Sequence, residues 1–401
     1  MRKPLRQARR LRAFTRTIAV ATCVTVVAGC SSTTDQATPS VTSETSSSVT
    51  AESSAASSSA APPPCGQAEL AKLSLRQKLA QRLVVGVTGA ADARQVVESE
   101  QIGGIFVGSW TDLTILTSGS AAKLSKEQKI PLMVTVDQEG GRVSRLKSIG
   151  IDLPSPRSMV AGGATAEQVR AQAKQAGEKM AEMGITVDFA PVVDVSSESD
   201  DEVIGDRSYS SDPEVVTEYA GAFAHGLQDA GIQPVYKHFP GHGSGSGDSH
   251  LGAVKTPPLS QLQKTDLVPY RTLLRDPGDA GVMVGHLIVP GLTAPDTPAS
   301  ISPRAIGMLR TGTKYDGPAF DGVIFSDDLS GMKAITDKYS IDQAVLQAFR
   351  AGSDIGLWLT TDQVPTVLNT LEKAVKDGKL NRNRIDASVV RILRAKGVVK
   401  C

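Results

Sequence analysis

Eight apolar runs separated by segments of helical spacing constrain the fold of this chain more than any other feature. The runs cover residues 82–87, 104–107, 132–136, 186–190, 234–236, 281–284, 323–325 and 354–359. The segments between them that have the spacing of amphipathic helices include 167–183, 213–230, 262–274 and 341–351. Apolar strands that alternate with helices indicate a parallel sheet covered on both faces. The sequence therefore predicts an α/β fold.

The number of runs and the chain length favour a closed barrel over an open sheet. About 335 residues follow from Cys65, a length typical of a single TIM-like (β/α)8 barrel. A doubly wound open sheet is the alternative. No glycine-rich dinucleotide-binding turn follows the first run, so the barrel is the favoured fold.

Polar residues follow several of the apolar runs directly. They are Asp137 and Glu139 after the third run, Asp194 after the fourth, Lys237 and His238 after the fifth, His286 after the sixth, and Asp327 and Asp328 after the seventh. Barrel enzymes build their sites from the carboxyl ends of several strands. We therefore expect these side chains to surround one site.

The segment from Lys237 to His250, KHFPGHGSGSGDSH, holds most of the chain's reactive groups. It contains three of the five histidines, with a lysine, an aspartate and four glycines. Ionisable groups are costly to bury without partners, so such a density is typical of a catalytic loop. The glycines permit backbone conformations that other residues avoid, as a loop that folds over a ligand requires.

A carboxylate and an imidazole in this pattern are suited to glycoside hydrolysis. Asp327 or Asp328 places a carboxylate directly after a buried strand, and Asp248 lies two residues before His250. A carboxylate nucleophile with a separate proton donor is the minimum set for hydrolysis with retention of configuration. The usual donor is a second carboxylic acid, so a His–Asp pair would depart from that rule.

Four sequence blocks resemble the bacterial β-N-acetylglucosaminidases of glycoside hydrolase family 3. The blocks are VDQEGGRV at 136–143, IGDRSY at 204–209, KHFPGHG with DSH at 237–250, and SDDL at 326–329. They occur in the family's order, and the resemblance covers roughly residues 70–400. Tyr209 stands where relatives often have Phe. The family fold is a TIM-like barrel, in agreement with the pattern of runs.

The resemblance also assigns roles to residues of this chain. Asp327 corresponds to the nucleophile, His250 to the acid/base and Asp248 to the partner of His250. The positions that would hold the terminal N-acetylglucosamine (GlcNAc) are Asp137, Arg145, Arg207, Lys237 and His238. The implied substrate is GlcNAc linked to N-acetylmuramic acid (MurNAc) in peptidoglycan fragments, and the resemblance implies no cofactor and no metal.

The amino end has the layout of an export signal. A basic leader that includes Arg9 and Arg10 precedes an apolar run at 18–28, which is short for a membrane span. The run closes on VAGC at 27–30, which resembles a bacterial lipobox. We therefore expect a lipoprotein signal peptide over residues 1–29 and an acyl anchor on Cys30, with the protein on the outer face of the cell membrane. An ordinary signal peptide, with Cys30 a free thiol, is the alternative.

Residues 30–64 are rich in Ser, Thr, Ala and Pro and contain no aromatic residue. Such a segment buries too little apolar surface to offset chain entropy, so we expect a disordered tether before a catalytic domain at 65–401. Cys65 and Cys401 lie at the two ends of that domain. In an oxidising compartment we expect them to form a disulfide.

Composition argues against a nucleic-acid partner. The chain has 43 basic and 42 acidic residues, and the basic excess lies in the leader. Aromatic residues make up only 4%, which favours a small pocket for one terminal sugar over a long cleft. Trp110 and Trp358 could each stack on a sugar or pack in the core. We expect a monomer.

Three other functions are compatible with the same residues. A zinc site could use His238, His242, Asp248 and His250, although their spacing matches no standard helical motif. A phosphorylase could use the same catalytic pair, because a neutral imidazole repels phosphate less than a carboxylate does. A lipid-anchored sugar-binding protein without activity is the non-enzymatic alternative.

Overall fold

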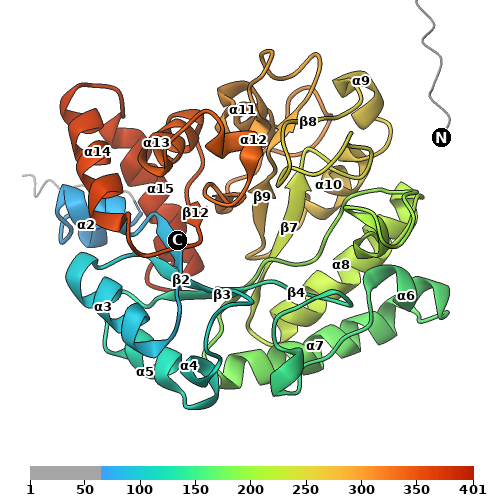
Figure 1. The fold of residues 1–401 in the computed structure, drawn as a ribbon, viewed down its shortest axis with the longest axis horizontal. Coiled ribbons are helices and arrows are strands. Elements are labelled where there is room, and N and C mark those ends of the chain that lie inside the picture. The colour runs from blue at the N-terminus through green and yellow to red at the C-terminus, as the bar shows by residue number, and fades with distance from the viewer. Residues whose placement is uncertain (1–64) are drawn as a thin grey trace, which may run out of the picture. The chain divides into compact units, whose positions relative to one another are not determined.

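A ring of eight parallel strands lies at the centre of the computed structural model, which describes residues 65–401 (Figure 1). The strands are β1 (Leu83–Gly86), β2 (Gly104–Val107), β3 (Met133–Val136), β6 (Val187–Asp188), β7 (Gln233–Phe239), β9 (Gly281–Val284), β11 (Ile324–Ser326) and β12 (Gly356–Trp358). Each strand pairs with its neighbour in chain order, and β1 also pairs with β12. A bridge between Phe325 and Ile355 joins β11 to the start of β12. The predicted TIM-like barrel is confirmed, and each of the eight runs overlaps one strand.

Helices follow the strands and surround the ring (Figure 1). The longer ones are α3 (Ala90–Glu100), α7 (Ala166–Glu182), α8 (Pro213–Asp229), α11 (Pro303–Thr311), α13 (Ile341–Ala351), α14 (Val364–Lys376) and α15 (Arg382–Ala395). Local sequence sets their ends. A Ser340–Gln343 capping box starts α13, and Gly352 ends it with a φ of 122°, which side chains with a Cβ rarely adopt.

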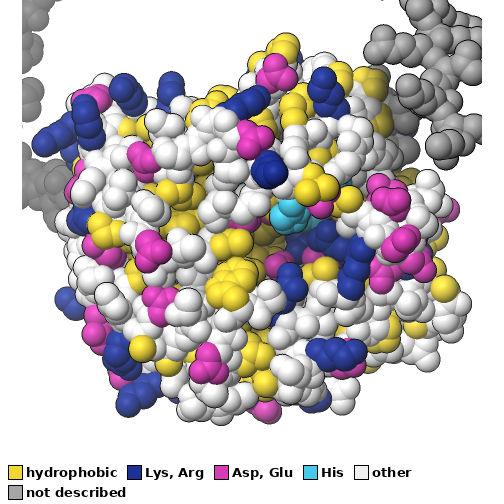
Figure 2. Space-filling model, viewed as in Figure 1, with side chains coloured by type: hydrophobic (Ala, Val, Ile, Leu, Met, Phe, Trp, Pro, Cys, Tyr) yellow, Lys and Arg dark blue, Asp and Glu magenta, His cyan; other side chains and the backbone are white. Residues whose placement is uncertain are grey.

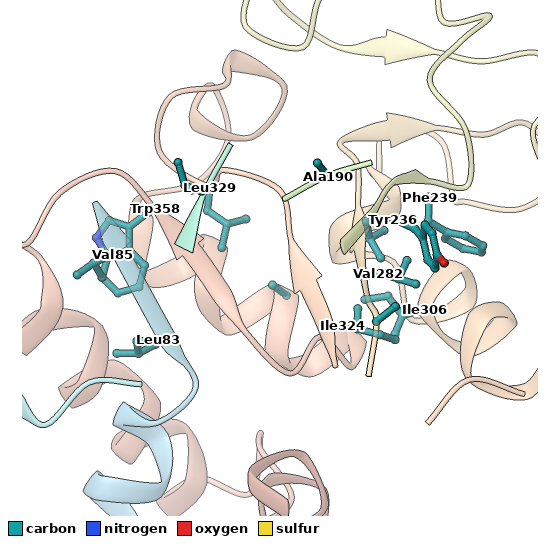
Figure 3. Packing of buried hydrophobic residues seen from close by; sticks show 14 of the residues in the cluster. Leu83, Val85, Ala190, Tyr236, Phe239, Val282, Ile306, Ile324, Leu329 and Trp358 are labelled. Atoms are coloured by element: carbon teal, nitrogen blue, oxygen red, sulfur yellow. The ribbon is translucent and has the colours of Figure 1, made fainter. Parts of the chain in front are cut away.

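The core has two parts because strand side chains alternate between the two faces of the ring. Leu83 and Val85 of β1 point outward to the helices, and Val85 lies beside Trp358 of β12 (Figure 3). Val84 of the same strand points inward. The inward cluster also contains Phe106, Met133, Val187, Phe189, Val235, Met283 and Phe325. Side chains therefore fill the barrel interior, and a site can form only at its ends.

Two predicted boundaries are wrong. The fifth strand does not end at residue 236, because β7 continues to Phe239, and Lys237 and His238 belong to the strand itself. The register between β7 and β9 shifts between Tyr236 and Phe239, where the strand becomes part of the site. The segment 262–274 is not one helix. It begins at the last residue of α9 (Leu259–Leu262), passes through turns and continues into the short helix α10 (Leu267–Leu273).

The ends of the described chain are joined covalently. Cys65 and Cys401 form a disulfide with Cα atoms 5.9 Å apart. Within residues 65–401 no helix is long and apolar enough to span a bilayer. The expected signal peptide at 1–29, the acyl anchor on Cys30 and the tether at 30–64 lie outside the described residues.

Candidate active site

One cavity of about 320 Å³ opens at the carboxyl ends of the strands. Its lining includes every residue to which the sequence assigns catalysis or sugar binding, namely Asp137, Arg145, Arg207, Lys237, His238, Asp248, His250 and Asp327. Figure 2 shows a hollow in which Lys and Arg side chains gather, with a histidine at its edge. A larger hollow of about 710 Å³ lies elsewhere and is lined by residues such as Gln81, Ile102 and Leu393. The smaller cavity is the candidate active site because the predicted catalytic and sugar-binding residues line it, although its volume is smaller.

Four charged side chains form the floor of this cavity. The Lys237 Nζ lies 2.7 Å from Asp137 Oδ1 and 2.6 Å from Glu139 Oε1. Arg207 donates two hydrogen bonds to Glu139, at 2.8 and 2.9 Å. Lys237 and Glu139 are almost fully buried, so each needs the other's charge to offset lost hydration. We call Asp137, Glu139, Arg207 and Lys237 the floor network.

The network keeps each of its buried members ionised. Burial alone would raise the pKa of Glu139, but Arg207 and Lys237 hold it far below its ordinary value. Burial alone would lower the pKa of Lys237, but Asp137 and Glu139 raise it above its ordinary value. The floor therefore presents fixed charges at neutral pH, which suits charge-assisted hydrogen bonds to hydroxyl groups.

Arg145 offers a further donor to the cavity. It follows the antiparallel pair β4 (Gln138–Gly140) and β5 (Val143–Ser144) that leads away from the floor network. Its buried Nε has no hydrogen-bond partner within residues 65–401. A buried donor without a partner is costly, so a ligand oxygen in the cavity would supply what the protein does not.

Asp194 fixes the two histidines at the start of the catalytic loop. Its Oδ2 lies 2.7 Å from the Nδ1 of His238. Its Oδ1 accepts hydrogen bonds from the backbone N–H groups of His238 and His242, at 3.2 and 2.7 Å. Burial would raise the pKa of Asp194, but His238 and His242 hold it below its ordinary value. A carboxylate on the imidazole leaves the Nε2 of His238 to face the cavity.

Asp248 and His250 form a pair on the exposed part of the loop. The Nδ1 of His250 lies 2.7 Å from Asp248 Oδ1, which also accepts the backbone N–H of His250 at 2.9 Å. The side chain of His250 is 59% exposed. Although partial burial favours the neutral acid, hydrogen bonds from His250 hold the pKa of Asp248 below its ordinary value. An anionic Asp248 orients the imidazole for proton transfer through its other nitrogen.

Asp327 and Asp328 differ in what their carboxylates contact. The Oδ1 of Asp328 accepts hydrogen bonds from the backbone N–H and the hydroxyl of Ser330, and its Oδ2 accepts one from the N–H of Gly331. Both aspartates line the cavity, but within residues 65–401 the one hydrogen bond that the carboxylate of Asp327 accepts comes from the N–H of Asp328. Geometry thus gives Asp328 a role in shaping its loop and leaves Asp327 available for reaction.

The pKa values of the two carboxylates are shifted in opposite directions, in agreement with these contacts. Burial raises the pKa of Asp328, and the neighbouring charge of Asp327 adds to the increase. Burial would also raise the pKa of Asp327, but His238, His286 and Lys237 hold it below its ordinary value. An ionised Asp327 at neutral pH is the form that can act as a nucleophile.

Several residues differ from the sequence-based interpretation or lay outside it. Trp110 lines the cavity and is 44% exposed, whereas Trp358 is buried in the core. His286 is buried and is not among the residues that line the cavity; it contacts the Ser300 hydroxyl and the carbonyl of Asp328. The sequence around Asp194 and His238 gave no indication that they are in contact, because 44 positions separate them.

The residues considered for zinc do not converge. His238 contacts Asp194 and His250 contacts Asp248, each in its own pair. Among residues 65–401, no group of three or more His, Cys, Asp or Glu side chains has the arrangement of metal ligands. The Asp248–His250 pair keeps the geometry for proton transfer.

Comparisons with known proteins agree with this geometry. Residues 74–395 match the model of the glycosyl hydrolase family 3 N terminal domain. The chain is 55% identical over 328 residues to the beta-hexosaminidase LpqI of Mycobacterium tuberculosis, with 82% of this chain and 84% of that protein covered.

Solved structures give the same result. A family 3 glycosyl hydrolase from Mycobacterium smegmatis superimposes with a TM-score of 0.80 at 54% identity, covering 82% of this chain and 99% of that one. A family 3 β-N-acetylglucosaminidase from a Paenibacillus species superimposes with a TM-score of 0.73 at 32% identity, covering 81% of this chain and 62% of that one. The chain is therefore a glycoside hydrolase and belongs to glycosyl hydrolase family 3, as a β-hexosaminidase.

Proposed function

We propose that this protein is a retaining exo-β-N-acetylglucosaminidase that releases terminal GlcNAc from peptidoglycan fragments. One observation carries the proposal: an ionised carboxylate, Asp327, and a carboxylate-paired imidazole, His250, line the same cavity. A nucleophile and a separate proton donor are what hydrolysis with retention requires. The names of the similar proteins, a beta-hexosaminidase and a β-N-acetylglucosaminidase, support GlcNAc as the sugar.

In the first step, Asp327 attacks the anomeric carbon of GlcNAc. The bond from that carbon to the glycosidic oxygen breaks, and His250 gives its Nε2 proton to the departing oxygen. Asp248 stays ionised and holds the other side of the ring through Nδ1. The products are a glycosyl ester on Asp327 and the free leaving sugar.

In the second step, neutral His250 takes a proton from water as the water oxygen attacks the anomeric carbon. The ester bond to Asp327 breaks, and its carboxylate is restored. Two inversions at one carbon give net retention. GlcNAc leaves as the β anomer, and His250 is protonated for the next cycle.

The floor network accounts for preference for a terminal sugar. Arg207, Lys237 and Asp137 line the cavity, and Lys237 is almost fully buried. We propose that they bind the GlcNAc hydroxyl groups together with Arg145 and His238. A chain that continued beyond those hydroxyls would meet buried charged groups, so the enzyme acts at chain ends.

The cellular setting follows from the amino end. We propose that Cys30 carries an acyl anchor and that the enzyme acts as a monomer on the outer face of the cell membrane, in cell-wall turnover. Labelling cells with an alkyne fatty acid tests the anchor, because Cys30→Ser should abolish the label and release the protein from membranes. Sedimentation equilibrium of residues 65–401 tests the monomer.

A product analysis tests the reaction itself. The soluble domain is incubated with GlcNAc-MurNAc, and NMR follows the released sugar, with Asp327→Ala as the inactive control. We expect β-GlcNAc to appear first and then to mutarotate. Initial release of α-GlcNAc would contradict the double displacement.

The same assay separates hydrolysis from phosphorolysis. With inorganic phosphate present, a phosphorylase would form GlcNAc 1-phosphate and its rate would rise with phosphate. We expect free GlcNAc and no dependence on phosphate. A wild-type protein that bound GlcNAc without releasing it from any glycoside would instead be a sugar-binding protein.

A further inference from the structure

A cavity rich in arginine lies at the amino ends of the strands, at the opposite end of the barrel from the catalytic cavity. It has a volume of about 680 Å³. Its lining includes Arg82 just before β1, Asp354 just before β12 and Asp321 just before β11. Its other walls come from α11, α13, the loop after α14 and the start of α15 (Figure 1). We call it the arginine cavity.

The lining of the arginine cavity carries a surplus of positive charge. Six of its side chains are Arg or Lys, and two are Asp. Both carboxylates already have cationic partners. Asp354 contacts Arg310 and Arg391. Asp321 contacts Arg391, and it also contacts Arg394, which lies outside the lining. The acidic residues therefore cannot balance the remaining cations.

Three arginines of the lining have no carboxylate in contact within residues 65–401, namely Arg82, Arg350 and Arg384. Arg82 donates to the carbonyls of Ser353 and Asp354, at 2.7 and 3.1 Å. Arg384 donates to the carbonyl of Arg350 at 3.2 Å. Carbonyls at the end of α13 favour cations nearby, but they carry no net charge. Three guanidinium charges thus remain without an anion.

Arg82 is the buried member of this group, with 3% of its surface exposed. Its guanidinium carbon lies 3.7 Å from the ring centroid of Phe349, so the planar group is held in one orientation. Its Nε and Nη2 donate to the carbonyls, and its Nη1 has no hydrogen-bond partner within residues 65–401. A buried cation of this kind is costly unless an anion approaches it.

Neighbouring cations add to that cost. Burial lowers the pKa of Arg82 to about 10, and although Asp354 opposes this decrease, Arg384 and Arg391 add to it. A bound anion would offset both the lost hydration and the repulsion between like charges. The protein keeps these cations together at the expense of the charged form of Arg82.

The guanidinium groups of Arg82 and Arg384 converge on one turn. A Cβ at Gly352 would come within 3.0 Å of the Nη2 of Arg384, so that group lies against the glycine. The next residue, Ser353, accepts the hydrogen bond from Arg82. The two forks therefore approach the same part of the cavity from α15 and from the start of β1. Planar forks of N–H donors match the oxygens of phosphate.

We infer that the arginine cavity is a binding site for a phosphate group, separate from the catalytic site. Phosphate fits better than a carboxylate because it offers more acceptor oxygens and up to two negative charges to several guanidinium groups. The phosphate can belong to a soluble ester or to a lipid head group, since both present the same oxygens. This site is independent of the proposed function, because it lies at the other end of the barrel.

Titration calorimetry of residues 31–401, which omit the expected anchor, tests the soluble source. The probes are inorganic phosphate and glycerol 1-phosphate, and glycerol is the uncharged control. We expect both phosphates to bind and glycerol not to bind. Arg384→Met should raise Kd about tenfold to a hundredfold, as loss of a charge-assisted hydrogen bond predicts.

Matched variants separate this cavity from general surface charge. Arg382→Met removes the same charge from the same helix, and Arg382 is exposed and outside the lining, so Kd should be nearly unchanged. Arg350→Met is a second variant of the lining, and its Kd should rise in the same direction as that of Arg384→Met. The thermal unfolding midpoint shows that each variant is folded.

Vesicles test the lipid source. Sedimentation with phosphatidylglycerol vesicles is compared with sedimentation with phosphatidylcholine vesicles, which have no net charge. If the phosphate is that of a lipid, the wild-type protein should sediment preferentially with phosphatidylglycerol. Arg384→Met should then lose most of that preference, and Arg382→Met should keep it.

Each outcome decides the question. Binding of either probe that Arg384→Met or Arg350→Met weakens and Arg382→Met keeps supports the site, and the probe that binds identifies the source. Binding of neither probe overturns the site, and so does an equal loss in all three variants. Phosphate binding that all variants keep, with competitive inhibition of glycoside cleavage, also overturns it, because the ion then occupies the catalytic cavity.

Discussion

The floor network and the Asp248–His250 pair lie in the same cavity but are built in different ways. In the floor, Lys237 contacts two carboxylates and Glu139 contacts two cations, with both side chains almost fully buried. On the loop, His250 is 59% exposed and its ring has Asp248 as its contact. The floor is held by ion pairs among four buried or partly buried side chains. On the loop, the ring of His250 contacts Asp248, and the residue between them, Ser249, contacts Met332 and Ala334.

This difference separates binding from proton transfer. Groups that grip a sugar must keep their positions, and buried ion pairs with several partners do so. A group that gives and regains a proton must meet the departing oxygen and then water. An exposed loop rich in glycine can reposition between the two steps. The following predictions test that division, beginning with the largest expected effect.

Asp327→Ala should lower kcat by roughly 10⁴- to 10⁶-fold, the usual range for loss of a nucleophile. Azide, which fits the space left by the carboxylate, should restore turnover of an activated aryl glycoside and give the α-glycosyl azide. Mass spectrometry and NMR identify that product. Asp328→Asn is the matched control, and it should lose far less activity because Asp328 shapes a loop. If Asp328→Asn lost more activity than Asp327→Ala, Asp328 would be the nucleophile.

His250→Ala should lower kcat/KM for GlcNAc-MurNAc by about 10²- to 10⁴-fold. Aryl glycosides with acidic leaving groups need little protonation, so kcat/KM for them should fall least. Because His250 is exposed, the free energy of unfolding should stay within about 0.5 kcal/mol of wild type. A uniform loss over all leaving groups, measured with a series of substituted phenyl glycosides, would sink the acid/base role.

Glu139→Gln should affect both stability and binding. It leaves Arg207 and Lys237 with less compensating charge, and breaking a buried pair costs about 3 kcal/mol or more of unfolding free energy. KM should rise because both cations lose their positions. Urea unfolding and steady-state kinetics measure the two effects. Asp248→Asn, on the loop, is the control and should leave stability nearly unchanged. If Glu139→Gln and Asp248→Asn lowered the free energy of unfolding equally, the floor network would be no more important for stability than the loop pair.

Lys396 tests what a partly buried lysine does when its partners within residues 65–401 include no carboxylate. Its Nζ donates to Gln81 Oε1 and to the carbonyl of Gly103, at the opposite end of the barrel from the floor. Burial lowers its pKa to about 7. The unfolded chain binds this proton more tightly, so stability should rise with pH between about 7 and 10.5 and fall as the solution is acidified through that window.

The measurement compares wild type with Lys396→Met. The stability curve of the variant should be flatter across that window, by less than about 1.4 kcal/mol per pH unit, the value for full exchange of one proton. Chemical unfolding at several pH values gives both curves. Parallel curves would show that Lys396 keeps its proton when folded, as Lys237 does.

The barrel and the residues that line the site could be predicted from the sequence, because both follow from the regular alternation of apolar runs and helical segments. Continuous apolar runs mark buried parallel strands, and the carboxyl ends of such strands meet at one end of a barrel. Asp137, Lys237 and Asp327 are far apart in the chain but follow or end such runs. That pattern was sufficient to place them in one cavity.

What sequence could not supply is the set of contacts between side chains. The apolar pattern ends at Tyr236, so nothing indicated that β7 continues through Lys237 and His238. Asp327 and Asp328 are adjacent and chemically identical, and only the contacts of Asp328 with Ser330 and Gly331 distinguish them. Trp110 and Trp358 each follow or end a strand, but tertiary packing exposes one and buries the other.

The disulfide between Cys65 and Cys401 has a mechanical consequence. It joins residues 336 positions apart, so the first and last helices of the barrel are fastened to each other. A pull on the chain before Cys65 would pass through the sulfur bond, so neither α1 (Gln67–Leu70) nor α15 would separate from its end first. Tension applied at Cys65 would therefore act on the barrel as a whole, and reduction of this one disulfide would let the terminal helices separate from it one at a time.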